Sequence, residues 1–281
     1  MTPTNIVMPG AVVLLLLAGS PLLSGFIRKV KNNLRMRRGA RILQPYYDLA
    51  KLWSKGRVVS TQTSWIFSAA PVIVCASSVS ACVVLVGSGG LFSAVPAGIL
   101  LAIFFLFALG RFFLALAGLD AGSSFGGMGS SREMFISALA EPALFVSLFV
   151  IGFNYPSQGV GVSTLLAGCA FFMVMLAETS RIPVDNQETH LELTMVHEAM
   201  VLEYSGRSLA LIELAGHIRQ IVLFVMLARF VSFLPVLLAI ACMVALVEVS
   251  LAKMRLFRVV DYLGFALFIA LMAAVAAVLR I

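Results

Sequence analysis

Eight apolar runs, each about as long as a helix needs to cross a bilayer, dominate this 281-residue sequence. They lie at about residues 6–27, 65–86, 94–118, 133–152, 163–177, 208–228, 231–252 and 261–280. Apolar residues make up 61% of the chain and charged residues 12%, against about 45–50% and about 25% in soluble domains. The sequence therefore predicts an all-α membrane protein, a single polytopic domain over residues 1–281, and excludes a soluble globular enzyme.

Basic residues are unevenly divided among the connecting segments. If the N-terminus is outside, the inside segments 28–62, 119–132, 178–207 and 253–260 hold sixteen Lys and Arg, and the outside segments hold two. Cytoplasmic segments retain this kind of basic excess. We therefore expect an N-terminus outside and a multi-pass chain in the cytoplasmic (inner) membrane. The net charge of +7 then reflects membrane topology, and no nucleic-acid partner is expected.

A short amphipathic helix is predicted in the first inside segment, at about residues 45–55. Tyr46, Leu49, Ala50 and Trp53 follow the spacing of one helix face, and lysines accompany them. Such a helix lies in the membrane interface. Two interpretations stay open: a lipid-facing anchor, or a lid over a cavity between the membrane and a docked partner.

Glycines and serines fill the inside segment 119–132. A phosphate-binding loop is excluded there, because no G-K-[ST] follows and no strand precedes the glycines. Glycines allow positive φ and close backbone approach. We therefore expect a tight, close-packed loop.

The inside segment 178–207 is unusually acidic. It holds six of the chain's 13 acids: Glu178, Asp185, Glu188, Glu192, Glu198 and Glu203. Glu188 and Glu192 are four residues apart and would share a helix face. Neighbouring like charges and burial both raise a carboxyl pKa. A carboxyl tuned toward neutral pH can exchange protons under cellular conditions.

Two other interpretations of this acidic segment were weighed. His190, Glu192, His197 and Glu198 could bind a metal ion, but their spacing matches no zinc or di-iron helix motif, so we expect no metal site. The acids could instead form a solvated docking surface for a basic partner. That interpretation is compatible with a proton role.

Several charged residues lie within the predicted spans or at their ends: Arg111, Glu141, Glu213, His217, Arg219, Glu248 and Asp261. Ionisable groups are costly in a bilayer and mark functional paths by default. For each single residue, an interhelical salt bridge, such as one between Arg111 and Glu141, is an equal alternative. For the set, a hydrated path linked to the acidic segment is favoured.

Three motifs connect the chain to a known family. They are Arg38-Gly39, Leu43-Gln44-Pro45, Asp48, Lys51-Leu52 and Lys55; Arg132 with Glu141; and Glu178, Arg181, Pro183, Asp185 and Glu188, followed by Glu192-Leu193 and Glu203-Tyr204-Ser205-Gly206. In these motifs the chain resembles subunit 1 of respiratory complex I. It more closely resembles the matching membrane subunit of formate hydrogenlyase and hydrogenase-4, the group 4 energy-converting nickel–iron hydrogenases, because of segment 122–133.

The resemblance implies a non-redox membrane subunit of an oxidoreductase complex, with no catalytic residue and no cofactor of its own. It implies hydrophilic hydrogenase-like large and small subunits docked on the cytoplasmic side. These partners would carry iron–sulfur clusters and, in the hydrogenase branch, nickel–iron. Antiporter-like membrane subunits and the lipid bilayer are the other implied partners. The expected role is to anchor the redox arm and to link electron transfer to ion translocation.

Nine acids and three arginines are the expected site residues. Proton coupling is assigned to Glu141, Glu178, Asp185, Glu188, Glu192, Glu198, Glu203, Glu213 and Glu248, and charge pairing to Arg111, Arg132 and Arg181. Arg132 and Arg181 would hold the acids of segment 178–207 in place. Two alternative functions remain: a quinone-chamber subunit of a complex I-type NADH or ferredoxin dehydrogenase, and a passive membrane scaffold for the soluble arm.

Overall fold

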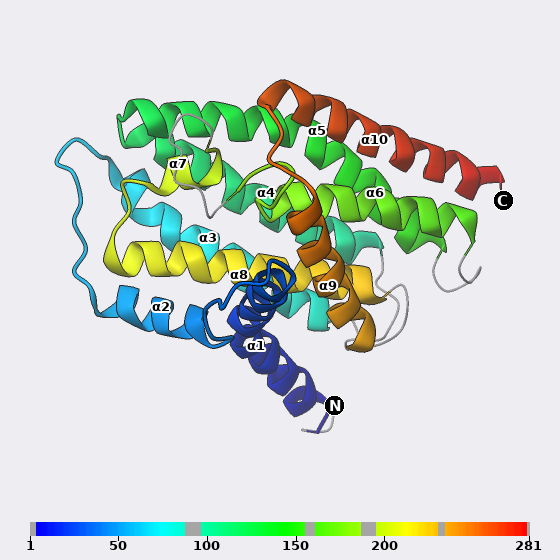
Figure 1. The fold of residues 1–281 in the computed structure, drawn as a ribbon, viewed down its shortest axis with the longest axis horizontal. Coiled ribbons are helices and arrows are strands. Elements are labelled where there is room, and N and C mark those ends of the chain that lie inside the picture. Colours follow the sequence, from blue (N-terminus) through cyan, green and yellow to red (C-terminus); the bar gives the residue numbers. More distant parts are fainter. Residues whose placement is uncertain (1–3, 88–96, 155–160, 187–194, 230–233, 280–281) are drawn as a thin grey trace.

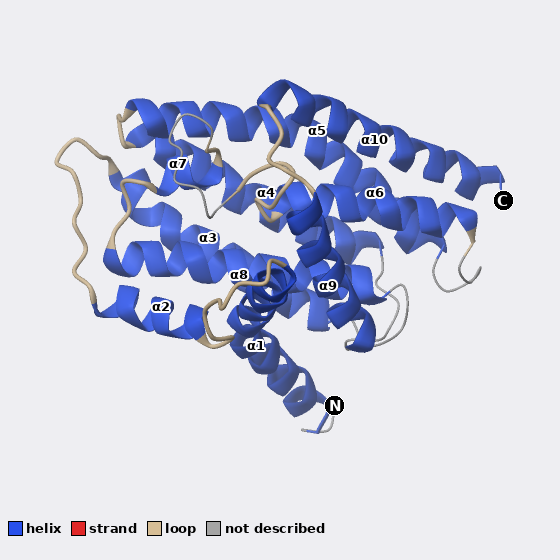
Figure 2. Cartoon of the chain, viewed as in Figure 1, coloured by secondary structure: helices blue, strands red, loops and turns tan. Residues whose placement is uncertain are grey.

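The computed structural model describes residues 4–87, 97–154, 161–186, 195–229 and 234–279, and every regular element in these ranges is an α-helix (Figure 1, Figure 2). The helices are α1 (Thr4–Leu34), α2 (Gln44–Ser54), α3 (Trp65–Gly87), α4 (Ala97–Asp120), α5 (Ser124–Asn154), α6 (Val162–Glu178), α7 (His197–Val201), α8 (Gly206–Arg229), α9 (Leu234–Ser250) and α10 (Leu256–Leu279). The predicted all-α class is confirmed.

Eight of these helices coincide with the eight predicted spans. Among the described residues, six are long and apolar enough to cross a membrane: α1, α3, α4, α5, α8 and α10. Helices α6 and α9 are apolar but shorter, at 17 residues each. The chain is therefore a multi-pass membrane protein. The count of eight crossings and the outside N-terminus stay predictions.

The long helices pack as one continuous bundle. Helices α5, α6 and α10 contact one another at one edge, α4 joins α5 to α3, and α3 packs on α8. Helices α1 and α9 contact each other and α8, and both run across the direction of the central helices (Figure 1). The bundle thus surrounds the inner part of α8 with α1, α3, α6 and α9.

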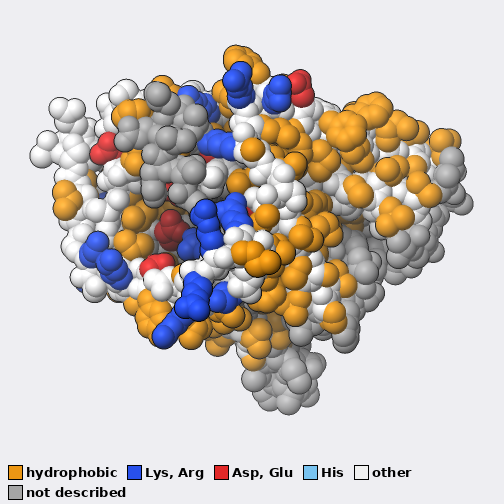
Figure 3. Space-filling model, viewed as in Figure 1, with side chains coloured by type: hydrophobic (Ala, Val, Ile, Leu, Met, Phe, Trp, Pro, Cys, Tyr) orange, Lys and Arg blue, Asp and Glu red, His pale blue; other side chains and the backbone are white. Residues whose placement is uncertain are grey.

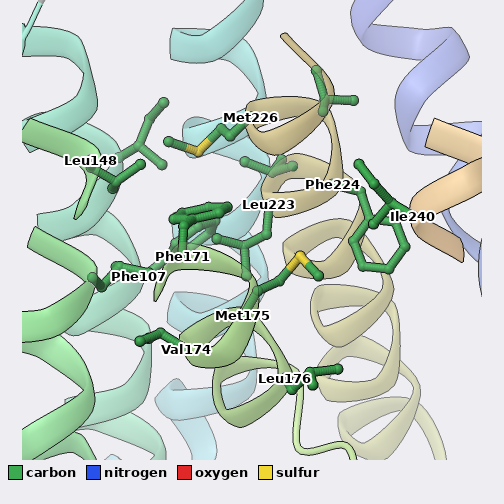
Figure 4. Packing of buried hydrophobic residues seen from close by; sticks show 14 of the residues in the cluster. Phe107, Leu148, Phe171, Val174, Met175, Leu176, Leu223, Phe224, Met226 and Ile240 are labelled. Atoms are coloured by element: carbon green, nitrogen blue, oxygen red, sulfur yellow. The ribbon is translucent and has the colours of Figure 1, made fainter. Parts of the chain in front are cut away.

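Large apolar side chains fill the bundle interior. Phe171 and Met175 on α6 and Phe224 on α8 are fully buried and lie in one cluster (Figure 4). The outer surface is also apolar, with Leu15 69% and Phe105 60% exposed. Such an outer surface suits lipid, and helices in lipid associate through close packing and hydrogen bonds more than through water exclusion.

The predicted inside segments meet at one end of the bundle. The backbone of Val58 bonds the Ser205 hydroxyl, Asp120 Oδ2 accepts from the Ser64 amide at 2.8 Å, and the Met254 amide donates to the Pro183 carbonyl at 2.9 Å. Lys and Arg side chains gather over this part of the surface, while apolar side chains cover much of the rest (Figure 3). These contacts agree with a common side for the four segments.

The glycine-rich segment is helical, so the predicted loop is wrong. A turn at 120–123 is followed directly by α5, which begins at Ser124. Close packing is nevertheless what the glycines provide. A Cβ at Gly126 would lie 2.4 Å from the Gly118 carbonyl oxygen of α4, and one at Gly129 would lie 3.0 Å from the Met200 amide of α7. Neighbouring helices therefore favour the helical form of this segment over the loop that glycine favours alone.

Helix α2 confirms the predicted helix at 45–55 and corrects its buried face. Pro45 is buried in the first turn, and Tyr46 and Leu49 are half-buried against α1 and α8. Ala50 is exposed and Trp53 is 52% exposed, although both were predicted on the buried face. The tertiary contact runs along the 45-46-49 side, so the Trp53 side is left facing outward.

Candidate functional site

One guanidinium organises a cluster of carboxylates inside the bundle. Arg111 of α4 is 4% exposed, and its Nη1 lies 3.0 Å from Glu141 Oε1 while its Nε lies 3.6 Å from Glu133 Oε1. Its Nη2 donates to Glu178 Oε2, at the end of α6. The predicted Arg111–Glu141 pair is thus present, and Glu133 and Glu178 join it. Three carboxylates around one guanidinium leave surplus negative charge, which Arg219 of α8 partly offsets through its field on Glu178 and Glu133.

A narrow cavity of about 50 Å³ opens beside this cluster. Its lining comes from α1, α8, the end of α6 and α7, and includes Arg28, Glu178, His197, Glu198, Glu213 and His217. Arg219 and Gln220 also line it, and Arg219 Nε and Gln220 Nε2 are buried donors with no protein acceptor among the described residues. Buried donors of this kind are normally satisfied by ordered water. At about 10–15 Å³ of probe volume for each water, the cavity has room for a few molecules.

Glu198 and His197 at this cavity have shifted pKa values. Burial, reinforced by the negative charges of Glu213 and Asp185, raises the pKa of Glu198 to about 7. Burial, together with the positive charge of Arg219, lowers the pKa of His197. Glu198 therefore exchanges a proton near neutral pH, and His197 stays neutral there.

A second group of buried charges joins α1, α9 and the segment after α6. Glu248 of α9 is 4% exposed, and its two carboxylate oxygens lie 2.6 Å from Arg181 Nη1 and 2.9 Å from Lys31 Nζ. Arg181 Nη2 also donates to Gln220 Oε1 at 3.1 Å, and the Ser24 hydroxyl donates to the same oxygen at 2.7 Å. This arrangement holds three elements together at the edge of the cavity.

Asp185 holds the backbone of the acidic segment. It is 2% exposed, and its Oδ2 accepts from the amides of Val196 and His197 at 3.2 and 3.1 Å. Its Oδ1 accepts from the Asn186 amide and lies 2.6 Å from Lys253 Nζ. The carboxylate is thus fully used by local backbone and one cation, which places α7 against the cavity.

The remaining predicted residues occupy different positions. Glu188 and Glu192 lie outside the described residues, as does His190. Glu203 is exposed, away from the cavity lining. Arg132 donates to the Met195 carbonyl at 3.0 Å, so its described contact is to the backbone of the acidic segment and not to a carboxylate. Within the described residues, no group of three His, Cys, Asp or Glu side chains could hold a metal ion.

Sequence reasoning missed several members of these networks. Glu133 was overlooked because the segment before it was expected to be a loop; on a continuous helix, its spacing of eight from Glu141 puts both acids on similar sides. Lys31 was counted only toward the basic excess, although it is 3% exposed. The partners of Lys253 depend on how the chain folds back, and no local signal reveals them.

The fold and these networks define a multi-pass membrane protein that keeps paired charges and a polar cavity inside its helix bundle. The chain belongs to the NADH dehydrogenase family of membrane proteins that are similar to subunit 1 of complex I, and the family model matches residues 6–279.

Similar proteins come from both branches of this family. The chain is 34% identical to hydrogenase-4 component C of Escherichia coli (strain K12) over 273 residues, covering 88% of this chain and 81% of that protein. It is 31% identical to formate hydrogenlyase subunit 4 of the same organism over 252 residues, covering 82% and 78%. A membrane component of the NADH-quinone oxidoreductase of Paraburkholderia phymatum is 27% identical over 232 residues, covering 70% and 64%.

A solved structure has the same fold. A chain of the membrane-bound sulfane sulfur reductase, an archaeal respiratory membrane complex, superposes with a TM-score of 0.76 at 16% identity, covering 97% of this chain and 99% of that chain. The relatives are thus subunits of oxidoreductase complexes, and the resemblance found in the sequence motifs is confirmed.

Proposed function

We propose that this chain is the membrane-anchor and proton-coupling subunit of an energy-converting hydrogenase or formate hydrogenlyase-type complex in the inner membrane. Relatives named as hydrogenase-4 and formate hydrogenlyase components support this branch. In this proposal, hydrophilic large and small subunits dock on the end of the bundle where α2 and α7 lie. They carry the iron–sulfur and nickel–iron centres, and antiporter-like subunits adjoin the chain in the membrane.

The observation that carries the proposal is the connection of buried carboxylates through the cavity. Glu178 belongs to both the Arg111 cluster and the cavity lining, and Glu198 lines the same cavity. A proton bound at Glu198 from the α7 side can reach Glu178 through a few waters, and Arg111 places Glu178 beside Glu141. Because Glu198 titrates near pH 7, both of its protonation states are populated under cellular conditions.

Surplus negative charge makes this connection sensitive to events at the docked subunits. A change of charge or position near α7 alters the field at Glu198 and Glu178, and Coulomb interactions are strong where water is scarce. We infer that electron transfer in the docked subunits changes proton occupancy along Glu198, Glu178 and Glu141. Continuation of this path into neighbouring membrane subunits would complete the coupling.

Charge-neutral variants in the assembled complex test the proposal. In membrane vesicles, Glu198→Gln and Glu141→Gln are expected to lower ion translocation per electron by at least fivefold while subunit assembly is unchanged. Glu203→Gln is the matched control, because Glu203 is exposed and does not line the cavity. Unchanged translocation per electron in both variants would contradict the coupling role and leave the passive scaffold.

The 27% identity to a component of an NADH-quinone oxidoreductase supports the quinone-linked alternative. The described cavity of about 50 Å³ is far smaller than the roughly 300–1,000 Å³ of ordinary ligand pockets. That size favours water over a quinone ring within this chain. Inhibition of turnover by a quinone-site inhibitor would favour the alternative.

A further inference from the structure

A separate groove of about 390 Å³ lies between the end of α2, the first half of α3 and the start of α8. We call it the basic groove. It has a cationic side and an apolar side, formed respectively by Lys55, Arg57 and Arg207 and by Pro71, Val72 and Leu211. The groove shares no lining residue with the cavity beside Glu178. Its volume lies in the range of pockets that bind small ligands.

The cationic side is suited to a phosphate. Lys55, Arg57 and Arg207 are exposed, and in the described part of the chain no carboxylate forms an ion pair with them. Arg57 Nη2 donates to the Ser68 hydroxyl at 2.7 Å, which turns this guanidinium toward α3 and the groove. Arg and Lys converging on one place are the side chains that recognise phosphate oxygens.

The walls of the groove are held in place by backbone contacts. The Ser205 hydroxyl bonds both the amide and the carbonyl of Val58, at 2.9 and 3.2 Å. Gly206 has φ +53°, and a Cβ there would lie 2.3 Å from the Gly56 carbonyl oxygen. The chain from Lys55 to Val58 therefore lies directly on the start of α8. A site fixed in this way loses little entropy when a ligand binds.

Both tryptophans of the chain place the groove at the membrane interface. Trp53 precedes the groove on α2 and is 52% exposed, and Trp65 begins α3 and is 69% exposed. Exposed tryptophans concentrate at the level of lipid head groups. Val72, 58% exposed on the candidate span α3, lies beyond them toward the apolar part of the helix. The cations thus lie at head-group level and the apolar side lies at acyl-chain level.

We propose that the basic groove binds one anionic phospholipid. The lipid phosphate lies among Lys55, Arg57 and Arg207, and the first part of an acyl chain lies along Pro71, Val72 and Leu211. A free anion would leave the apolar side unused. A zwitterionic lipid would bring its own cation next to three others. The occupant is therefore a membrane lipid with net negative charge, and this inference is independent of the proposed proton coupling.

Native mass spectrometry of the full chain in mild detergent tests this proposal. Phosphatidylglycerol and phosphatidylcholine with identical acyl chains are titrated separately, and occupancy of the first bound lipid is measured. Phosphatidylglycerol is expected to bind at least tenfold more tightly. In the triple variant Lys55→Gln, Arg57→Gln, Arg207→Gln, the two lipids should bind within twofold of each other.

Two further variants separate the groove from charge in general. The triple variant Arg37→Gln, Arg41→Gln, Arg258→Gln removes the same charge from exposed positions elsewhere and should keep the tenfold preference. Val72→Trp fills the apolar side without changing charge and should lower phosphatidylglycerol occupancy at least fivefold. Unchanged melting temperatures show that the variants remain folded.

Three results would overturn the proposal. The first is a phosphatidylglycerol preference that survives removal of the groove cations or is lost equally in the control. The second is displacement of the lipid by millimolar inorganic phosphate, which would indicate a simple anion site. The third comes from a photo-crosslinking residue at Val72 in the native complex: a single protein adduct would show that a partner subunit fills the groove, whereas a lipid adduct is expected.

Discussion

Glu248→Gln tests whether the buried charges of the bundle hold its helices together. The substitution keeps the shape of the side chain and removes the charge that Lys31 and Arg181 contact at 2.9 and 2.6 Å. At an effective dielectric constant of about 20, each pair at these distances has a Coulomb energy of about 6 kcal/mol, most of which offsets desolvation. Removing one partner of a buried ion pair costs about 3–5 kcal/mol net. We therefore expect the free energy of unfolding to fall by about that amount.

Reversible unfolding of the full chain in mixed micelles with increasing SDS, followed by tryptophan fluorescence, measures this loss. Glu203→Gln is the matched control and should change the free energy of unfolding by less than about 0.5 kcal/mol, because Glu203 is exposed. The double variant Lys31→Met, Glu248→Gln should lose at least about 1 kcal/mol less than the sum of the two single variants. A loss below about 1 kcal/mol for Glu248→Gln, or simple additivity, would refute the reasoning.

Three further predictions concern α7 and its surroundings. Because the pKa of Glu198 is raised from 4.5 to about 7, its contribution to stability is complete below pH 4.5 and is lost as pH rises through about 7; Glu198→Gln should therefore flatten the fall in melting temperature between pH 5 and pH 8. Gly129→Ala should destabilise by about 1–3 kcal/mol, because its Cβ would lie 3.0 Å from the Met200 amide, whereas Gly127→Ala, with nothing within 4 Å, should be neutral or stabilising in the same unfolding assay. Tyr204→Phe removes the hydrogen bond to the Phe67 carbonyl and should cost about 1 kcal/mol in that assay, and an unchanged value would show that the bond contributes nothing.

Hydropathy and charge predicted the features that depend on local sequence. The long helices follow the apolar runs because a bilayer requires internally satisfied backbone over its whole thickness. The amphipathic helix at 45–55 followed from period and from a proline in its first turn. The Arg111–Glu141 pair was predicted as an alternative because two opposite charges within apolar helices need a partner.

Features that depend on tertiary contact could not be predicted in this way. The glycines of segment 119–132 favour a loop locally, but packing against α4 and α7 makes most of the segment helical, and with that error Glu133 was lost from the site. Asp185 was expected among the proton-coupling acids. Its bonds to the amides of Val196 and His197 depend on a chain reversal that spacing does not reveal. Local patterns thus show which residues are charged and buried, whereas the fold determines their partners.

Gentle affinity purification of the native complex, followed by mass spectrometry of its subunits and nickel analysis, tests the central proposal most directly. The account predicts that hydrogenase-like large and small subunits and antiporter-like membrane subunits co-purify with this chain, together with nickel. Co-purification with quinone-linked dehydrogenase subunits and no nickel would contradict the hydrogenase assignment. Recovery of the chain without any redox partner would contradict the anchor role itself.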